Sequence, residues 1–553
     1  MNMLSLGSVP PLRCVTMCVS LLLLTIVGCD SSTKPSGSGK KSASRPKGDD
    51  RFVGTIMGMC EPDRLGLDSS PDQVAGLLNQ WWMRSGESDE LANAFGSQAI
   101  ARLENEMPAG TLNRAADARF DERDVEFIRD AQMFREIVDL ALSQEDHPEP
   151  ALFDWVVRNV ELEADSDSVA KTPYEIVMFG RGTAEERAWV FAELMRQLRL
   201  DTFIIKPQDA DDSSRWLVAV EDENGLGQLY DPVVGVPVPT STDWLQNVEP
   251  KAASLQQLHD NEELWKSLYP AGDGFGEQDF TSWDAEAIGT STLWAPRMQQ
   301  LQQSVSADAL TAVIYQPLPE PDRKLPFVKK ISLWPFPEKQ LVARYTTEEP
   351  LRYANLWLPF QMPFSVEVPG GVLQAGDANQ LRNSLQLGQP LQLQLKARTS
   401  QLGGDLSSAI QEYINVRLQC TRMDELSNVP TELRRSHSKA FEDAYFWIGV
   451  CQFELGRLEQ AAQTFASYVD HELFRDRGSH LEQARLLLAQ CQNTPEDRAI
   501  YLREIPDGSP AKDQADFELR KLQSLTPDDV EPTVEPKEAA PSKPSGPAVA
   551  EKP

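Results

Sequence analysis

Three carboxylates in the middle of the chain, Glu185, Glu186 and Asp231, are the side chains that could carry acid–base chemistry. A pair of carboxylates can supply a general acid and a general base, which is one route to a hydrolase or a transferase. A thiol paired with an imidazole has no candidates in this stretch, because no cysteine occurs between positions 60 and 420 and no histidine between 147 and 259. Catalysis here would have to use the carboxylates.

The elements that must position these carboxylates are a helix and three strands. Thr183 and Glu186 have the spacing of a capping box, and apolar residues then recur at helical spacing as far as Leu198. Strands are predicted at 202–205, 216–220 and 228–232. Glu185 and Glu186 fall in the first turn of the helix, where acidic side chains are stabilising whatever the function. The carboxylate mechanism is therefore the less favoured hypothesis.

This order of elements resembles the core of the transglutaminase-like superfamily, whose fold is shared with papain-like thiol enzymes. The resemblance covers roughly residues 120–240. In that family the helix opens with Gly-x-Cys, a later strand begins with His, and a third strand carries Asp-Pro. Here Gly182-Thr183-Ala184 stands at the first motif, Arg215 at the histidine, and Asp231-Pro232 matches the third.

The resemblance implies a non-catalytic relative. Acyl transfer in this family needs a thiolate, an imidazole and a carboxylate that orients the imidazole. Ala184 has no nucleophile, the guanidinium of Arg215 cannot accept a proton, and Asp231 beside Arg215 is expected to form an ion pair. We therefore expect no catalytic residue, no cofactor and no metal site. The family's groove binds extended peptides, so a protein or peptide partner is expected, with a cell-wall peptide as one candidate.

The N-terminus has the layout of a secretory signal. An apolar run from Val15 to Val27 follows Arg13 and ends at Gly28-Cys29. A small residue before cysteine resembles the lipobox of bacterial lipoproteins, which implies cleavage before Cys29 and its acylation. The alternative is a plain cleaved signal or a transmembrane anchor, although the run is short for a span of about 20 residues. The expected location is the cell envelope, on a membrane and facing the periplasm or the exterior. Asp30 favours the inner membrane by analogy.

Composition excludes one class of partner. The net charge of −31 argues against a nucleic-acid ligand, because the phosphate backbone must be neutralised by clustered basic residues.

Four cysteines follow the signal in a compartment that permits disulfides, and three pairings are open. The alternative, favoured for the last two, is that they are small apolar core residues. These cysteines are Cys60, Cys420, Cys451 and Cys491.

The C-terminal third contains a repeat. Residues 404–413 and 456–465 share the frame Gly-x-Leu-x-x-Ala-x-Gln-x-aromatic, and a small residue, Ala397 or Gly449, stands seven positions before each glycine. The frame resembles the tetratricopeptide repeat, in which two helices pack through small residues. The two glycines are 52 positions apart, which is more than the family's period of about 34 residues. An additional helix is therefore expected near 432–440, and a third helical pair near 481–505.

The predicted fold class is α+β: a papain/transglutaminase-like core with a helical N-terminal part, a small β-rich region and C-terminal α-helical repeats. Aromatic residues of the β-rich region, from 309 to 368, are expected in the core rather than in a ligand groove; they are Trp334, Phe336, Trp357, Phe360 and Phe364. The predicted divisions are a lipoprotein signal peptide (1–28), a disordered tether (29–52), a helical segment with the transglutaminase-like core (53–250), a helical then β-rich region (251–375), tetratricopeptide-like repeats (376–525) and a disordered tail (526–553).

The sequence thus predicts a membrane-anchored envelope lipoprotein that binds a protein or peptide without turnover. One alternative is a hydrolase or transferase that uses Glu185, Glu186 and Asp231. Another is a core domain that only holds the repeats at a distance from the membrane.

Overall fold

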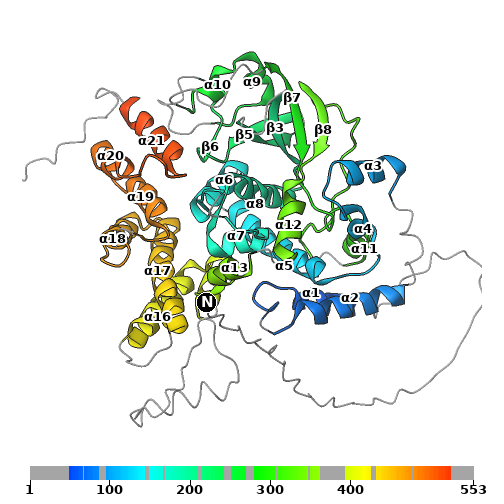
Figure 1. The fold of residues 1–553 in the computed structure, drawn as a ribbon, viewed down its shortest axis with the longest axis horizontal. Coiled ribbons are helices and arrows are strands. Elements are labelled where there is room, and N and C mark those ends of the chain that lie inside the picture. The colour runs from blue at the N-terminus through cyan, green and yellow to red at the C-terminus, as the bar shows by residue number, and fades with distance from the viewer. Residues whose placement is uncertain are drawn as a thin grey trace, which may run out of the picture. The chain divides into compact units, whose positions relative to one another are not determined.

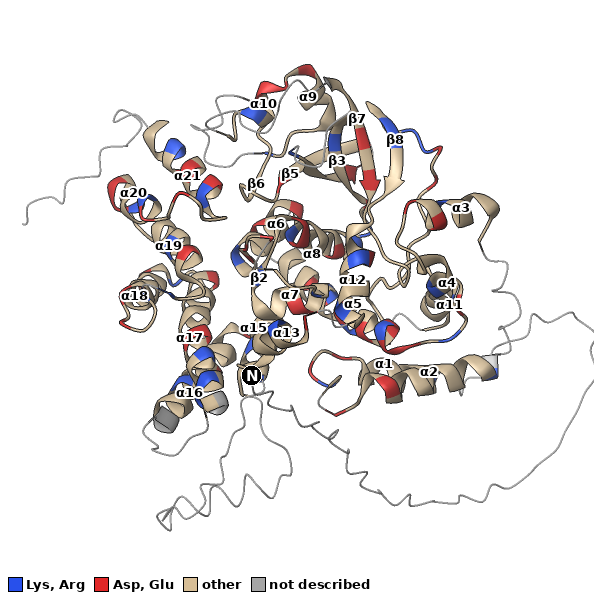
Figure 2. Cartoon of the chain, viewed as in Figure 1, with Lys and Arg blue, Asp and Glu red and all other residues tan. Residues whose placement is uncertain are grey.

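A computed structural model describes residues 49–524 of the 553-residue chain, apart from 67, 86–94, 144–147, 166–167, 209–214, 223–224, 242–250, 270–278, 306–308, 347–348, 361–392, 425–430 and 476. The predicted signal peptide, Cys29, Asp30, most of the tether, His147, Phe364 and the predicted tail therefore lie outside the described residues. None of the described helices is long and apolar enough to cross a membrane. Lys and Arg are interspersed with Asp and Glu over the described elements (Figure 2).

The main sheet has six strands in the order β6-β5-β4-β3-β7-β8 (Figure 1). Strands β7 and β8 are parallel, and the other neighbours are antiparallel. The strands are β3 (Thr202–Gln208), β4 (Leu217–Asp222), β5 (Gly225–Asp231), β6 (Val236–Pro237), β7 (Asp279–Ala287) and β8 (Val328–Leu333). The meander β3-β4-β5 confirms the three predicted strands, and the mixture of helices with this sheet confirms the α+β class. A second, parallel pair joins β1 (Glu161–Leu162) to β2 (Arg181–Gly182).

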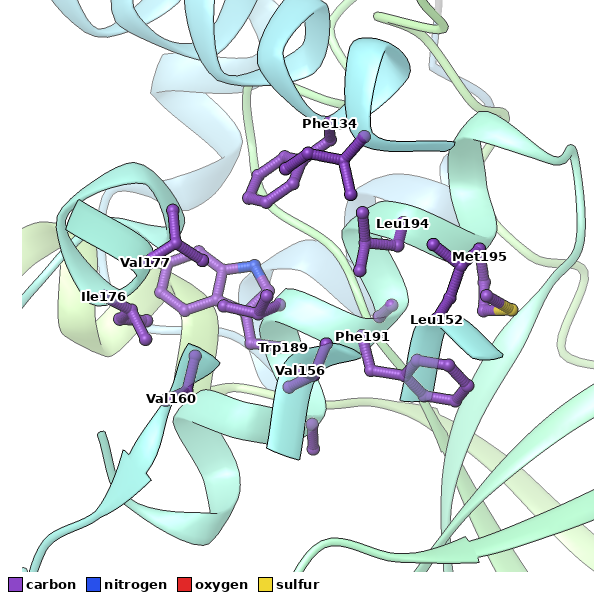
Figure 3. Close-up of a cluster of buried hydrophobic side chains, with 14 of the residues drawn as sticks. Phe134, Leu152, Val156, Val160, Ile176, Val177, Trp189, Phe191, Leu194 and Met195 are labelled. Atoms are coloured by element: carbon purple, nitrogen blue, oxygen red, sulfur yellow. The ribbon is translucent and has the colours of Figure 1, made fainter. Parts of the chain in front are cut away.

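Helix α8 (Ala184–Gln197) packs on one face of this sheet. Its capping box is present as predicted, since the Thr183 side chain accepts from the backbone N–H of Glu186 and the Glu186 carboxylate accepts from that of Thr183. Buried side chains of α8, of α6 (Pro148–Asn159) and of α7 (Pro173–Phe179) form one apolar cluster, here called the α8 cluster (Figure 3). The sheet contributes Ile204, Val218, Val220 and Tyr230 to it.

The alternate side chains of the same strands form a second apolar cluster, here called the far cluster, which includes Phe203, Ile205, Leu217, Ala219 and Leu229. Successive residues of a strand point to opposite faces, so the far cluster lies on the face of the sheet away from α8. It is covered by the region of α9 (Leu255–Asp260) and α10 (Glu263–Lys266), including Trp265, Leu268 and Tyr269. Figure 1 shows these helices across the sheet from α8.

The N-terminal helices are α1 (Asp49–Met59), α2 (Pro71–Ser85), α3 (Ser97–Asn105), α4 (Thr111–Ala116) and α5 (Glu122–Leu142). They confirm the helical pattern predicted for this part. Helix α1 starts inside the predicted tether, so the assignment of 49–52 to disordered chain was wrong. The reason is packing: Val53, Ile56 and Met57 are buried in a cluster with Trp81 and Trp82 of α2, which stabilises the helix from its first turns.

The predicted division of residues 251–375 was partly wrong. Strand β7 lies where helix was expected, because it pairs with β3 and β8 in the sheet. Helix α11 (Pro296–Ser304) lies in the part that was predicted to be helical. Within the predicted β-rich region, β8 is a strand, whereas α12 (Phe336–Thr346) and α13 (Pro350–Trp357) are helices. The expectation that its aromatic residues pack in the core holds for Trp334 and Phe360, which are buried in the α8 cluster. Phe336 stacks on Trp334, and Trp357 packs edge-on against Phe179.

The C-terminal part consists of helical hairpins, as the repeat predicts. The helices are α15 (Leu393–Leu402), α16 (Leu406–Asp424), α17 (Thr431–Glu454), α18 (Leu458–Val469), α19 (Leu481–Gln490), α20 (Pro495–Arg503) and α21 (Lys512–Ser524). Ala397, Ala409 and Ala461 are completely buried between helices. The separate helix predicted near 432–440 does not form; those residues lengthen α17 instead.

All four described cysteines are free and buried, so the core-residue alternative is correct and the disulfide alternative is wrong.

The first helix of each hairpin packs on the core, and so does α21. Arg398 of α15 donates to the carbonyl of Val177 at 3.1 Å. Glu454 of α17 accepts from Asn159 at 2.8 Å, and Gln483 of α19 donates to the carbonyl of Val157 at 3.2 Å. Phe517 of α21 belongs to the far cluster. One side of the helical array is thus occupied by the chain's own core.

Candidate functional site

A pocket lies at the N-terminal end of α8. Its volume is about 460 Å³, and it is bordered by Thr183 and Glu185 of the first turn, on either side of Ala184. The other walls come from the segment before α7 and from α12 and α13. This pocket, here called the α8 pocket, is lined by Asp165, Ser168, Val169, Ala170, Thr183, Glu185, Phe336, Lys339, Gln340, Ala343, Arg344, Glu349 and Tyr353.

Glu186 is buried beside this pocket and has a structural role. Its Oε2 accepts from the backbone of Thr183 at 3.0 Å and lies 3.0 Å from Nζ of Lys171, which is also completely buried. Glu163 is the second carboxylate on Lys171. Burial raises the pKa of Glu186 to about 7, although the Lys171 charge acts in the opposite direction. Glu186 therefore holds the helix start and a buried ion pair.

Ser168 and Lys171 resemble a serine–lysine pair, because Oγ of Ser168 is 3.0 Å from Nζ of Lys171. A lysine activates a hydroxyl only when it is neutral. Burial acts to lower the pKa of Lys171, but the charges of Glu186 and Glu163 outweigh burial and the net pKa is raised. Lys171 keeps its proton, so Ser168 has no base in this pair.

Asp231 is buried at the end of β5, on the far side of the sheet from α8. Tyr230 points into the α8 cluster, and its neighbour Asp231 points the other way, where it accepts from Tyr269 and from Trp265 Nε1. The backbone N–H groups of Val233 and Val234 donate to Oδ1 at 2.9 and 3.0 Å. Burial raises the pKa of Asp231. Its carboxylate closes the turn after β5.

Arg215 lies on the same far face. Its guanidinium is 3.3 Å from the centroid of the Tyr269 ring and forms an ion pair with Asp513 of α21 at 3.4 Å. Tyr269 therefore contacts both Arg215 and Asp231. Arg215 and Asp231 thus meet at Tyr269, but the ion pair described for Arg215 is with Asp513 and not with the expected Asp231, and the sheet lies between both residues and Ala184.

The three carboxylates of the alternative mechanism do not meet. Glu185 borders the α8 pocket, Glu186 is buried in the cap and its ion pair, and Asp231 is on the far face of the sheet. An acid and a base must both reach one substrate. The carboxylate mechanism predicted as an alternative has no assembled site.

A second pocket, of about 630 Å³, lies between the core and the helical repeats. Helix α13 borders both cavities: Glu349 and Tyr353 face the α8 pocket, whereas Arg352, Asn355 and Leu356 face the second one.

Sequence reasoning missed both α13 and the buried Lys171. One available signal was Thr172-Pro-Tyr-Glu175, a capping box with proline at the first helical position, which marks the start of α7. Helix α13 also begins with a proline, Pro350, but has no capping box.

Cys60 and Cys491 are not reactive thiols. Burial raises the pKa of Cys60 to about 12 and that of Cys491 to about 11, so both stay protonated near neutral pH. Within the described ranges, no group of three or more His, Cys, Asp or Glu side chains is arranged to hold a metal ion.

Fold and site together define an α+β protein with a mixed-charge pocket at a capped helix N-terminus and helical hairpins packed on its core. Comparison with protein families, with curated proteins and with solved structures found no match.

Proposed function

We propose that this chain is a membrane-anchored envelope protein that binds a peptide in the α8 pocket without turning it over. The observation that carries the proposal is the position of the pocket. It opens at the start of α8, where a relative of the transglutaminase-like superfamily would hold its nucleophile. The first residue of the helix is Ala184, and its neighbours Thr183 and Glu185 line the pocket. A pocket of this size lies in the range of about 300–1,000 Å³ typical of small-ligand sites.

The helical repeats support the site rather than provide it. Tetratricopeptide-like arrays commonly bind peptides on one side, but here α15, α17, α19 and α21 turn that side toward the core. A peptide would have to displace those contacts. The repeats therefore stabilise the core and form part of the wall of the second pocket, and we assign peptide binding to the α8 pocket.

Replacing Ala343 by tryptophan should abolish peptide binding. Ala343 is on α12 and lines the α8 pocket, so an indole there would fill part of the 460 Å³ cavity. A mixture of tripeptides incubated with the full chain should be retained on size-exclusion chromatography and recovered with unchanged masses. Ala101→Trp, on the exposed side of α3, is the matched control and should retain them as the parent does. Hydrolysed or transferred products would refute the non-catalytic proposal.

Replacing Cys29 by serine should release the protein from the membrane. The lipobox resemblance implies that this sulfur carries the lipid, and two or more acyl chains anchor stably at about 0.8 kcal/mol for each buried methylene. The variant should lose incorporation of labelled fatty acid and leave the membrane fraction or remain unprocessed. Cys18→Ser, inside the apolar run, should behave as the parent. Unchanged lipid labelling of Cys29→Ser would refute the anchor. Asp30 favours the inner membrane, which density-gradient fractionation tests.

A further inference from the structure

We propose that the ligand of the α8 pocket is a short zwitterionic peptide, bound through its ammonium group by Asp165 and Glu185 and through its carboxylate by Lys339. This inference rests on the proposed function and adds the chemistry that selects the ligand. It comes from the charged side chains that line the pocket and that form no ion pair with another described residue.

Two carboxylates of the pocket have no ion-pair partner among the described residues. They are Asp165, from the segment before α7, and Glu185, from the first turn of α8. The third, Glu349, is 2.9 Å from Arg352 and is exposed together with it. A cation that enters the pocket therefore meets two carboxylates that are not already neutralised.

Of the two cations that line the pocket, Lys339 and Arg344, one already has a carboxylate partner. Arg344 is held by Glu175 through bonds of 2.8 and 3.0 Å and stacks on the ring of Tyr353. Lys339, one turn earlier on α12, has no carboxylate partner among the described side chains and is exposed. Lys339 is thus the pocket cation that remains for a ligand carboxylate, and it comes from a different wall than Asp165 and Glu185.

A neutral acceptor completes the arrangement. Gln340 lines the pocket next to Lys339, and its Oε1 is buried without a hydrogen-bond donor from the described residues. A buried acceptor without a donor costs about 1–3 kcal/mol, so a ligand N–H that reaches it would be favoured. Peptide N–H groups and ammonium groups are such donors.

The charge balance also excludes other ligands. Two unpaired carboxylates against one unpaired ammonium leave one negative charge in excess, so phosphates, nucleotides and other polyanions would be repelled. An uncharged apolar ligand would offer no partner to any of the three charged groups. A short peptide with both ends free carries the opposite charges in one molecule and fits a cavity of about 460 Å³.

The test uses the full chain in detergent micelles and isothermal titration calorimetry with trialanine, N-acetyl-trialanine and trialanine amide. Blocking either end should weaken binding about tenfold or more, because each block removes a hydrogen bond between charged groups. Glu185→Gln combined with Asp165→Asn should bind N-acetyl-trialanine and trialanine alike while still rejecting the amide, and Glu185→Gln alone should reduce the preference for trialanine. Lys339→Met should bind trialanine amide and trialanine alike while still rejecting N-acetyl-trialanine.

Glu459→Gln is the matched control, because Glu459 occupies in α18 the position that Glu185 occupies in α8 and is exposed away from the pocket. It should reproduce the parent's discrimination. Equal binding of all three peptides, still lost in Ala343→Trp, would overturn the zwitterion inference and leave the peptide-binding function standing. Failure of all three to bind would overturn both.

A last arm separates two sources of such a peptide. An L-alanyl peptide ending in two D-alanines has the same charged ends as trialanine but the stereochemistry of a cell-wall stem. Tighter binding of this peptide would identify a cell-wall ligand, and tighter binding of trialanine would identify an ordinary protein fragment. Either preference, if it depends on Glu185 and Lys339, supports the shared chemistry.

Discussion

Replacing Arg297 by methionine should lower the free energy of unfolding by about 3–5 kcal/mol, which is the usual cost of breaking a buried ion pair. Arg297 of α11 and Asp124 of α5 are almost completely buried, and their side chains are joined at 2.7 and 2.8 Å. The guanidinium also donates to the carbonyls of Arg114 and Asp117. The methionine would leave the Asp124 charge buried and unpaired.

Thermal unfolding followed by circular dichroism measures the effect. The control is Arg64→Met, because Arg64 pairs with Glu61 at 2.9 Å on the surface and exposed pairs contribute about 0–1 kcal/mol. Adding Asp124→Asn to Arg297→Met should recover part of the loss, since the amide can still accept in the capping box of α5 and carries no charge. Equal losses in Arg297→Met and Arg64→Met would mean that the Asp124 pair is not buried.

Replacing Gly180 by alanine should cost about 2–5 kcal/mol, more than the same change at another left-handed glycine. Gly180 ends α7 with φ of +68°, where a side chain costs about 1–2 kcal/mol. A Cβ there would also overlap the ring of Trp447 on α17, and overpacking adds about 1–3 kcal/mol. Trp447 is itself buried and stacks against Arg398 at 3.6 Å.

Gly456 provides the matched control, because its φ is +70° and a Cβ would meet nothing within 4 Å. Gly456→Ala should therefore show only the backbone cost. Combining Gly180→Ala with Trp447→Leu should cost less than the sum of the two single changes, because the smaller side chain makes room for the methyl group. If both glycine variants lose the same stability, the first helices of the hairpins do not pack on the core as described.

These two variants test different parts of the same arrangement. Arg297 joins α11 to the N-terminal helices, whereas Gly180 lies where the repeats contact the core. Either variant, where it remains folded, should still bind peptide in the α8 pocket, because neither residue lines the pocket. A variant that is folded but does not bind would point to a wider site.

Local patterns in the sequence were sufficient for several elements. The capping box at Thr183 and Glu186, the meander β3-β4-β5 and the helical hairpins were all predicted correctly. Each depends on interactions between residues close in the chain: a cap across three positions, alternation along a strand, and a glycine turn between two helices. Such interactions act in any tertiary context, so the sequence alone determines them.

Elements that depend on distant partners were not predictable in this way. Strand β7 forms because it lies between β3 and β8, and the residues near 432–440 continue α17, where Ala440 is buried in the cluster shared with α16. Strand β8 is followed by α12 and α13, although both helices lie in the region that was predicted to be β-rich. In each case the local sequence pattern favoured another secondary structure only weakly, and packing against distant segments determined which structure formed.

The candidate site shows the same division. The sequence alone determined that Ala184 starts a capped helix, that Arg215 precedes a strand and that Asp231 ends the next one. Only the tertiary structure decided that α8 covers one face of that sheet while Arg215 and Asp231 point from the other. Alternation along a strand sets which residues share a face, but the face on which a helix packs depends on where apolar area from the whole chain can be buried. The pocket that remains at the start of α8 is a product of that packing, since its walls come from segments more than 150 residues apart.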